Sequence, residues 1–175
     1  IYLRELSSGG AVVVDRIGAV TVDIDGVVKA NFNSTTSDVS QDRSLQSLED
    51  LTTTSDGSIK LVAESGTITV NAGASSTAGV AAQGAGDVLL EARGTSSDVV
   101  INADTGSVEG NITIYAHDDI LAGANLSTGG TGSIYLVAQN ANLADIAAAA
   151  TSEVDGINAG GLIATAQGDV LLETQ

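Results

Sequence analysis

The chain has 175 residues, no Cys and a single His, and its 22 acidic against 6 basic residues give a formal net charge of −16. These counts exclude disulfides, thiolate metal sites and cysteine nucleophiles, and they argue against a nucleic-acid partner because six cations neutralise few phosphates. No run of about 18 apolar residues is present, so we expect no membrane span. An apolar content of 43% with many β-branched residues favours a packed domain over disorder.

The first 56 residues contain short β-type runs without a clear repeat. Segments 11–14, 20–24 and 27–30 are rich in Val, so we expect each to be a strand. Gly18 precedes the second of these segments and marks the expected start of a second coil. Segment 34–56 is polar and has Leu residues at threefold spacing, and we expect it to be an insertion, either a loop or a short helix, on the side of the coils.

One motif recurs through the rest of the chain. It consists of Gly, a small polar residue, alternating aliphatic residues and, in most copies, Ala. The copies are 57–63, 86–92, 110–116, 132–138 and 168–174. Their glycines are 29, 24, 22 and 36 residues apart, and an irregular period of this size is typical of stacked coils rather than of a propeller or a helical array. Residues 1–4 fit the same motif without its Gly-polar pair.

The longest spacing contains an alanine-rich stretch at 140–156. Leu143 and Ile146 have helical periodicity there, so we expect 140–156 to be a second loop or short-helix insertion. An alternative interpretation makes 143–147 a strand, and both interpretations stay open.

Two further motifs follow within the coils. Segment 67–72 matches 99–103 and, more loosely, 120–124, while 79–84 resembles 163–168. Three short strands per coil, separated by Gly, Ser, Asn and Asp, predict a triangular β-solenoid. The expected fold class is therefore all-β, a parallel β-helix (β-solenoid) of about six coils with one or two side insertions, and 1–175 forms a single segment of it.

Alternation within the first motif assigns its side chains to two faces. The first inward column is expected to contain Ile1, Ile59, Val88, Ile112, Ile134 and Val170. The next contains Leu3, Leu61, Leu90, Ile114, Leu136 and Leu172, followed by a small residue at Ala63, Ala92, Ala116 and Ala138. The outward column varies freely: Tyr2, Lys60, Leu89, Thr113, Tyr135 and Leu171. Asn71 and Asn102 are equivalent in the second motif, and we expect their amides to stack as a ladder.

Because parallel β-helices include polysaccharide lyases and glycosidases, an enzymatic function has to be weighed. Glu91 and Glu173 occupy equivalent outward positions, but about three coils separate them. That is on the order of 14 Å, beyond the roughly 5–10 Å that glycoside hydrolysis needs. A lyase needs clustered cations, whereas the basic residues are scattered at Arg4, Arg16, Lys29, Arg43, Lys60 and Arg93. We therefore expect no catalytic residues and no enzymatic activity.

Two acidic stretches are candidate ligand sites. His117 precedes Asp118 and Asp119, and we interpret this triplet as a solvated turn rather than a ligand cluster. Asp23 and Asp25 lie on one strand face before a Gly turn and are weak calcium candidates, because the stretch has neither EF-hand spacing nor the glycine-rich nonapeptide of calcium-binding β-rolls. Calcium is the single cofactor that the sequence leaves open.

The motifs Gly-polar-Ile-x-Leu-x-Ala and Val-Asn-Ala-Gly, with the opening Ile1-Tyr2-Leu3-Arg4-Glu5-Leu6, resemble the repeats of very large secreted bacterial proteins. These include filamentous-haemagglutinin-like adhesins and other giant surface exoproteins. The resemblance covers residues 57–175 and, less clearly, 1–30. It implies a right-handed parallel β-helix, an extracellular or cell-surface location, and a role as a shaft, fibre or adhesive element. No catalytic motif transfers.

The function that we expect is a rigid structural segment of such a fibre or adhesin. Its expected partners are further coils of the same chain or of identical chains stacked head to tail, together with cell-surface glycans. A carbohydrate-binding or carbohydrate-cleaving β-helix is the main alternative, and a calcium-stabilised surface-layer module is a third. Aromatic residues, on which sugars stack, are few: Tyr2, Tyr115, Tyr135 and Phe32.

Overall fold

A computed structural model describes residues 1–22, 28–30, 36–38, 43–45, 49–139 and 157–174. Every regular element in these ranges is a β-strand. The chain divides into two compact units, one formed by Ile1–Asp15 with Glu49–Gln175 and the other by Arg16–Leu48. The first unit is a parallel β-solenoid, as the sequence predicted.

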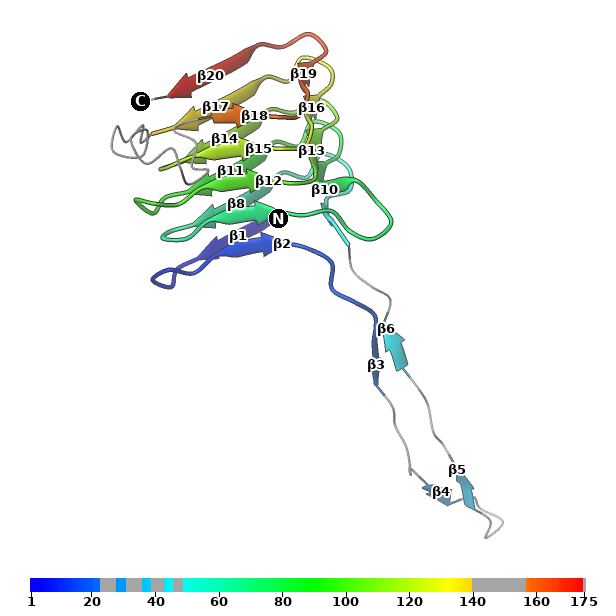
Figure 1. The fold of residues 1–175 in the computed structure, drawn as a ribbon. Coiled ribbons are helices and arrows are strands. Elements are labelled where there is room, and N and C mark those ends of the chain that lie inside the picture. Colours follow the sequence, from blue (N-terminus) through cyan, green and yellow to red (C-terminus); the bar gives the residue numbers. More distant parts are fainter. Residues whose placement is uncertain (23–27, 31–35, 39–42, 46–48, 140–156, 175) are drawn as a thin grey trace. The chain divides into compact units, whose positions relative to one another are not determined.

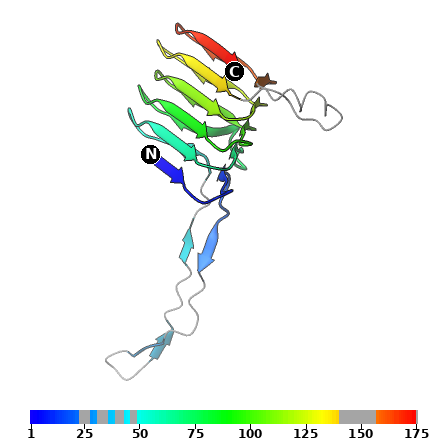
Figure 2. The same cartoon turned by 90° about the vertical axis from the view of Figure 1, so that its left-hand side faces the viewer.

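Each of the five complete coils contributes one strand to each of three parallel sheets, and the start of a sixth coil adds one strand to the first sheet (Figures 1 and 2). The first sheet has six strands: β1 (Tyr2–Glu5), β8 (Ile59–Ala63), β11 (Val88–Ala92), β14 (Ile112–Ala116), β17 (Ile134–Ala138) and β20 (Val170–Thr174). The second has five: β2 (Val12–Val14), β9 (Ile68–Val70), β12 (Val99–Ile101), β15 (Ile120–Ala122) and β18 (Ile157–Ala159). The third also has five: β7 (Leu51–Thr52), β10 (Ala78–Ala82), β13 (Asp104–Ser107), β16 (Leu126–Thr128) and β19 (Ile163–Thr165). The expectation of about six coils is thus confirmed.

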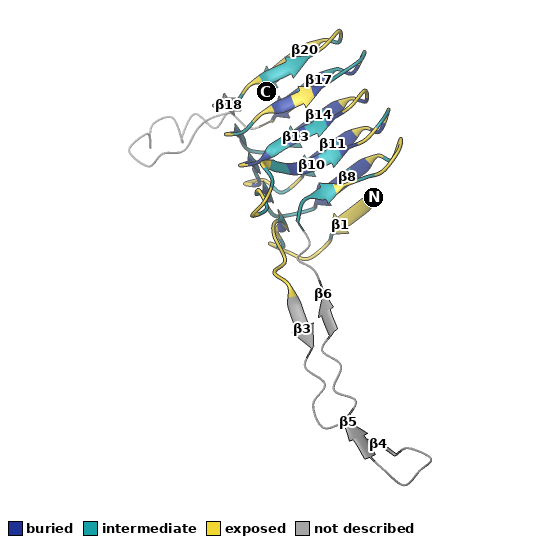
Figure 3. Ribbon diagram, turned by 90° about the vertical axis from the view of Figure 1, so that its right-hand side faces the viewer, coloured by how far each residue is buried: buried dark blue, intermediate teal, exposed yellow. Residues whose placement is uncertain are grey.

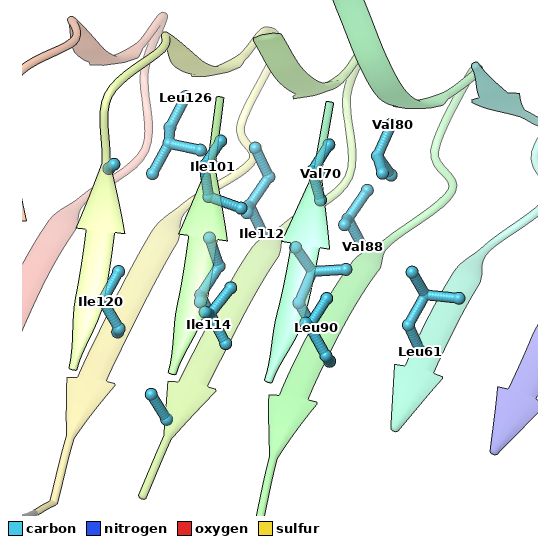
Figure 4. Packing of buried hydrophobic residues seen from close by; sticks show 14 of the residues in the cluster. Leu61, Val70, Val80, Val88, Leu90, Ile101, Ile112, Ile114, Ile120 and Leu126 are labelled. Atoms are coloured by element: carbon cyan, nitrogen blue, oxygen red, sulfur yellow. The ribbon is translucent and has the colours of Figure 1, made fainter. Parts of the chain in front are cut away.

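The strand register confirms the expected columns. Leu3 pairs with Leu61, Leu61 with Leu90 and Leu90 with Ile114, and the column continues to Leu172. In the middle coils these side chains are fully buried, and they meet residues of the facing sheets such as Ile101 (Figure 4). Uniform aliphatic columns fill the interior because each side chain packs on its equivalent in the next coil.

The glycine of the first motif is required by close backbone contact at one corner. A Cβ on Gly110 would lie 2.3 Å from the carbonyl oxygen of Gly86, and a Cβ on Gly132 would lie 2.2 Å from that of Gly110. The same relation links Gly86 to Gly57 and Gly168 to Gly132. Each glycine therefore rests on the carbonyl of the glycine one coil earlier, where no side chain fits.

Hydroxyl groups satisfy the glycine carbonyls at this corner. Ser107 donates through Oγ to the carbonyl of Gly86 at 2.7 Å, and Thr128 donates through Oγ1 to that of Gly110 at 2.5 Å. Both hydroxyl residues are buried and lie on the inward face of the third sheet. A buried carbonyl without a donor is costly, so the hydroxyls stabilise a turn that glycine alone makes possible.

Replacing Thr128 by Val is expected to lower the free energy of unfolding by about 1–3 kcal/mol, because the Gly110 carbonyl would lose its donor in a buried position. Urea denaturation measures this change. Thr113→Val is the matched control, since Thr113 faces outward and is partly exposed. Equal effects of the two changes would contradict a stabilising role for the buried hydroxyl.

The side chain of the small polar residue in the motif accepts a hydrogen bond from the backbone of the next coil. Ser58 Oγ accepts the amide of Asp87, and Asp87 Oδ1 accepts the amide of Asn111. Asn111 Oδ1 in turn accepts the amide of Ser133, whose Oγ accepts that of Asp169. A side-chain ladder therefore links successive coils along this corner.

The other two corners have shorter ladders of the same kind. Asp98 Oδ1 accepts the amide of Asp119, and Asp104 Oδ1 accepts the amide of Asn125. The expected asparagine ladder is confirmed, because Asn102 Nδ2 donates to Asn71 Oδ1 at 3.0 Å. It extends one coil further than expected, since Asn71 Nδ2 donates to Asp15 at 3.2 Å.

Three sequence predictions need correction. Segment 18–22 does not begin a coil: β3 (Val20–Val22) pairs antiparallel with β6 (Arg43–Leu45) in the second unit. Alternation predicts a strand but says nothing of its partner. The match of 79–84 with 163–168 is wrong by one residue. Strand pairing links Val80 to Ile163 through Thr105 and Leu126, so Val80, rather than Gly79, is the equivalent of Ile163. The shared Ala-Gln-Gly ending does not mark equivalent positions, because Ala82 is the last residue of β10 whereas Ala166 follows the end of β19.

The third correction concerns 34–56, where we expected a loop or short helix. The described residues there form β5 (Thr36–Asp38), β6 and β7, and β5 pairs antiparallel with β4 (Val28–Ala30). Leu51 in β7 belongs to the solenoid, since it pairs with Val80. The second insertion, 140–156, lies outside the described residues, as does the strand considered at 143–147.

Candidate functional site

The outward side of the six-stranded sheet, here called the outer face, has the most varied chemistry of the solenoid. It consists of two columns of side chains. The first column contains Tyr2, Lys60, Leu89, Thr113, Tyr135 and Leu171. The second contains Arg4, Val62, Glu91, Tyr115, Val137 and Glu173. All three tyrosines of the chain lie on it. The ammonium of Lys60 lies 5.7 Å from the centre of the Tyr2 ring, a favourable cation–π distance.

A chain of ion pairs runs along the edge of the outer face. Arg4 Nε lies 2.7 Å from Glu64 Oε1, and Arg93 Nη1 lies 2.9 Å from the same oxygen. Arg93 also pairs with Glu91, with Nε 2.8 Å from Oε1 and Nη2 3.0 Å from Oε2. Two of the cations that look scattered in sequence are therefore neutralised at one corner. Extending the motif alignment one residue past its Ala would have found Glu64 and Arg93 on neighbouring coils.

These contacts shift pKa values in directions that preserve the usual charges. The hydrogen bond from Arg4 lowers the pKa of Glu64, partial desolvation opposes it, and the charges of Arg4 and Arg93 lower it further. The hydrogen bond to Glu91 raises the pKa of Arg93. The hydrogen bond from Tyr135 to Glu173, 2.8 Å long, raises the pKa of the Tyr135 hydroxyl. At neutral pH these groups stay an anion, a cation and a neutral phenol, so none of the three is prepared for proton transfer.

Arg4→Gln is expected to raise the pKa of Glu64 towards that of an ordinary glutamate. A folded-state pKa below the unfolded value means that the ion pair stabilises the fold above the unfolded pKa. This contribution is lost as the pH falls through the folded pKa. An NMR titration of the Glu64 carboxyl carbon measures the shift, with Lys60→Gln on the same face as the control. An unchanged Glu64 titration in Arg4→Gln would show that Arg4 does not hold the carboxylate.

The residues weighed for catalysis stay apart. Glu91 pairs with Tyr115, Tyr115 with Val137 and Val137 with Glu173, so three strand spacings, about 14 Å, separate the two carboxylates. Each carboxylate also has its own partner, Arg93 and Tyr135 respectively. This arrangement agrees with the separation expected from the sequence.

His117 lies in a bend after β14, and the backbone of the bend connects coils. The His117 amide donates to the Ala92 carbonyl at 2.9 Å, and the Asp118 amide donates to that of Ser97 at 3.2 Å. The imidazole Nδ1 is buried and has no hydrogen-bond partner. The calcium candidates Asp23 and Asp25 lie outside the described residues. In the part of the chain that is described, no group of three or more His, Asp or Glu side chains could hold a metal ion.

No family model, curated protein or solved structure matches this chain. Among the described strands and turns there is no helix long and apolar enough to cross a membrane.

Proposed function

We propose that the chain is a structural β-solenoid segment of a bacterial extracellular or cell-surface fibre or adhesin, in which the stacked coils form a rigid shaft. The observation that carries the proposal is the continuity of contacts between coils. Strands pair in parallel from coil to coil in three sheets, with one register shift between β10 and β13, and side-chain ladders join the coils at the corners. Hydrogen bonds between coils run along the stack, so they resist extension and bending of the shaft.

The side chains of the outer face support a scaffold rather than an enzyme. The ionisable groups that a hydrolase would use are engaged in ion pairs and hydrogen bonds with their neighbours. The resemblance of the repeats to those of secreted bacterial adhesins supports the extracellular location. The acidic surface, with a net charge of −16, would keep neighbouring shafts apart by repulsion.

Further coils are the partners that this fold accommodates. β1 and β20 are the two edge strands of the six-stranded sheet, and each has a neighbour on one side within the described solenoid. Backbone groups on the other side are available for another parallel strand. Further coils of the same chain or an identical chain stacked head to tail would provide it.

Surface labelling of intact cells tests the proposed function. Antibodies raised against the 175-residue chain are expected to bind non-permeabilised cells of the source organism, and electron microscopy with gold labels should place them on filaments or a surface layer. Cells that express the protein but bind antibody only after permeabilisation would overturn the extracellular assignment.

Glycan binding by the outer face is a second candidate function. The favouring observation is that Tyr115 lies opposite Val137 while Tyr135 precedes Val137 by two residues, which puts two rings on neighbouring coils of one face. Sugars stack on such rings, and carboxylates like Glu173 bind their hydroxyls. A glycan array tests this, with Tyr115→Ala expected to abolish binding and Tyr2→Ala, three strands away, expected to retain it. Absence of binding by the native chain would remove this candidate.

A further inference from the structure

One inward position at the end of β1 departs from the pattern of the other coils. The small residue that ends this strand is Ala63, Ala92, Ala116 and Ala138 in the four coils that follow, and all four are buried. The register of β1 with β8 puts Glu5 opposite Ala63. The coil that begins with β1 therefore has a carboxylate where the interior of the next four coils has a methyl group.

The chain after β1 is arranged around this carboxylate. Glu5 Oε1 accepts hydrogen bonds from the amide and the hydroxyl of Ser7, while Oε2 is buried and has no partner. A Cβ on Gly10 would lie 2.1 Å from Glu5 Cδ, so the loop passes close to the carboxyl group. The carboxylate is thus enclosed by the loop that follows its own strand.

The rest of the β1 edge is well suited to pairing. Ile1 donates to Ser58 and accepts from Lys60, and Glu5 accepts from Glu64, so the odd-numbered residues bond to β8. The backbone groups of Tyr2 and Arg4 consequently point away from β8. Ile1 and Leu3 are 53% and 50% exposed, whereas their equivalents Ile59 and Leu61 are 1% and 0% exposed (Figure 3). An apolar edge with unpaired backbone groups attracts another strand.

We propose that Glu5 is a gatekeeper that prevents the edge strand of a second copy of this chain from pairing with β1. A strand added there would enclose the carboxylate between Ala63 and the new strand, where none of the described buried residues is a cation that could neutralise it. An inward-pointing charge at a sheet edge opposes edge-to-edge association for this reason.

The opposite edge supports this assignment. β20 has Val170, Leu172 and Thr174 at its inward positions, none of them charged. In the first sheet β20 follows β17, whereas in the other two sheets β18 and β19 are the last strands. This inference rests on the proposed function and concerns head-to-tail stacking of identical copies: identical copies do not pair at β1.

The test compares self-association of the native chain with that of Glu5→Ala, which introduces the residue of the other coils. Sedimentation velocity should show Glu5→Ala associating at concentrations at least about tenfold lower than the native chain. Glu5→Gln, which keeps the size and removes the charge, should be intermediate, and it carries the test if Glu5→Ala fails to fold. Arg4→Ala, which removes a charge that points outward, should sediment like the native chain.

Disulfide trapping identifies the paired edge, because the native chain has no Cys. Tyr2→Cys in the Glu5→Ala background should form cross-linked dimers under mild oxidation, either with itself or with Leu171→Cys. Ser127→Cys in β16, an inner strand of the third sheet, should not form such dimers. The proposal is overturned if folded Glu5→Ala sediments like the native chain, or if Tyr2→Cys cross-links equally with Glu5 present. Surface labelling of cells does not depend on this result, so the two proposals can fail separately.

Discussion

Leu90→Asp is expected to prevent folding of the solenoid. Leu90 is fully buried between Leu61 and Ile114 in the inward column, and the described interior around it is aliphatic. A carboxylate there has no partner, and burying it costs several kcal/mol, comparable to the whole stability of a domain of this size. Circular dichroism should show that the β-sheet signal of the native chain is lost in this variant.

The neighbouring substitution provides the control. Leu89 faces outward between Lys60 and Thr113, so Leu89→Asp should change the free energy of unfolding by about 0.5 kcal/mol or less. The milder Leu90→Ala quantifies the inward position, with an expected loss of about 2–5 kcal/mol in urea denaturation. Similar losses at positions 89 and 90 would mean that the inward and outward assignment is wrong.

Gly110→Ala is the second change with a large expected effect. The added Cβ would stand 2.3 Å from the Gly86 carbonyl oxygen and 2.6 Å from its carbon, and both are backbone atoms that cannot rotate away. The two coils would have to separate at this corner, which also disrupts the bridge that the Ser107 hydroxyl forms between the Gly86 carbonyl and the Gly110 amide. We expect a loss of about 1–3 kcal/mol or more, visible as a lower midpoint in thermal denaturation.

Gly123→Ala is the matched control for this change. A Cβ on Gly123 would lie 3.5 Å from the nearest atom, the carbonyl oxygen of Ile101, which is an ordinary contact. Since alanine also restricts the unfolded chain, Gly123→Ala should leave the midpoint unchanged or raise it slightly. If both substitutions lowered stability alike, the close contact at Gly110 would not explain the glycine of the motif.

Periodicity predicted the interior of the solenoid well, for a physical reason. Each inward residue packs on its equivalent in the next coil, so the columns from Ile59 and from Leu61 repeat the same shape and leave a signal in the sequence. Polar ladders leave a weaker signal, because Ser58, Asp87 and Asn111 accept an amide equally well. The motif showed that this position is small and polar without showing why.

Contacts that depend on one pair of coils were not predictable in this way. Arg4, Glu64 and Arg93 meet once, so no repeat marks their contact, although aligning the residue after the motif's Ala places Glu64 and Arg93 on neighbouring coils. Val62 faces outward in the register, yet it is 1% exposed, because Arg4 and Glu91 flank it in the same column and their ion pairs lie beside it. The departure at Glu5 is visible in the sequence only after the register shows which residue it replaces.

The corner ladders have a consequence for how such a protein changes length. Each coil receives the same kinds of contact from the coil on either side, so a coil is an interchangeable module. Removing residues 86–109 would bring Gly110 onto Gly57 and Asn111 onto Ser58, with Ile112 following Ile59 in the interior column. During evolution, duplication of a coil therefore lengthens the molecule by about 4.8 Å and deletion shortens it by the same amount, and neither change requires a new interface between coils. The length of such a stack is therefore set by the number of its coils.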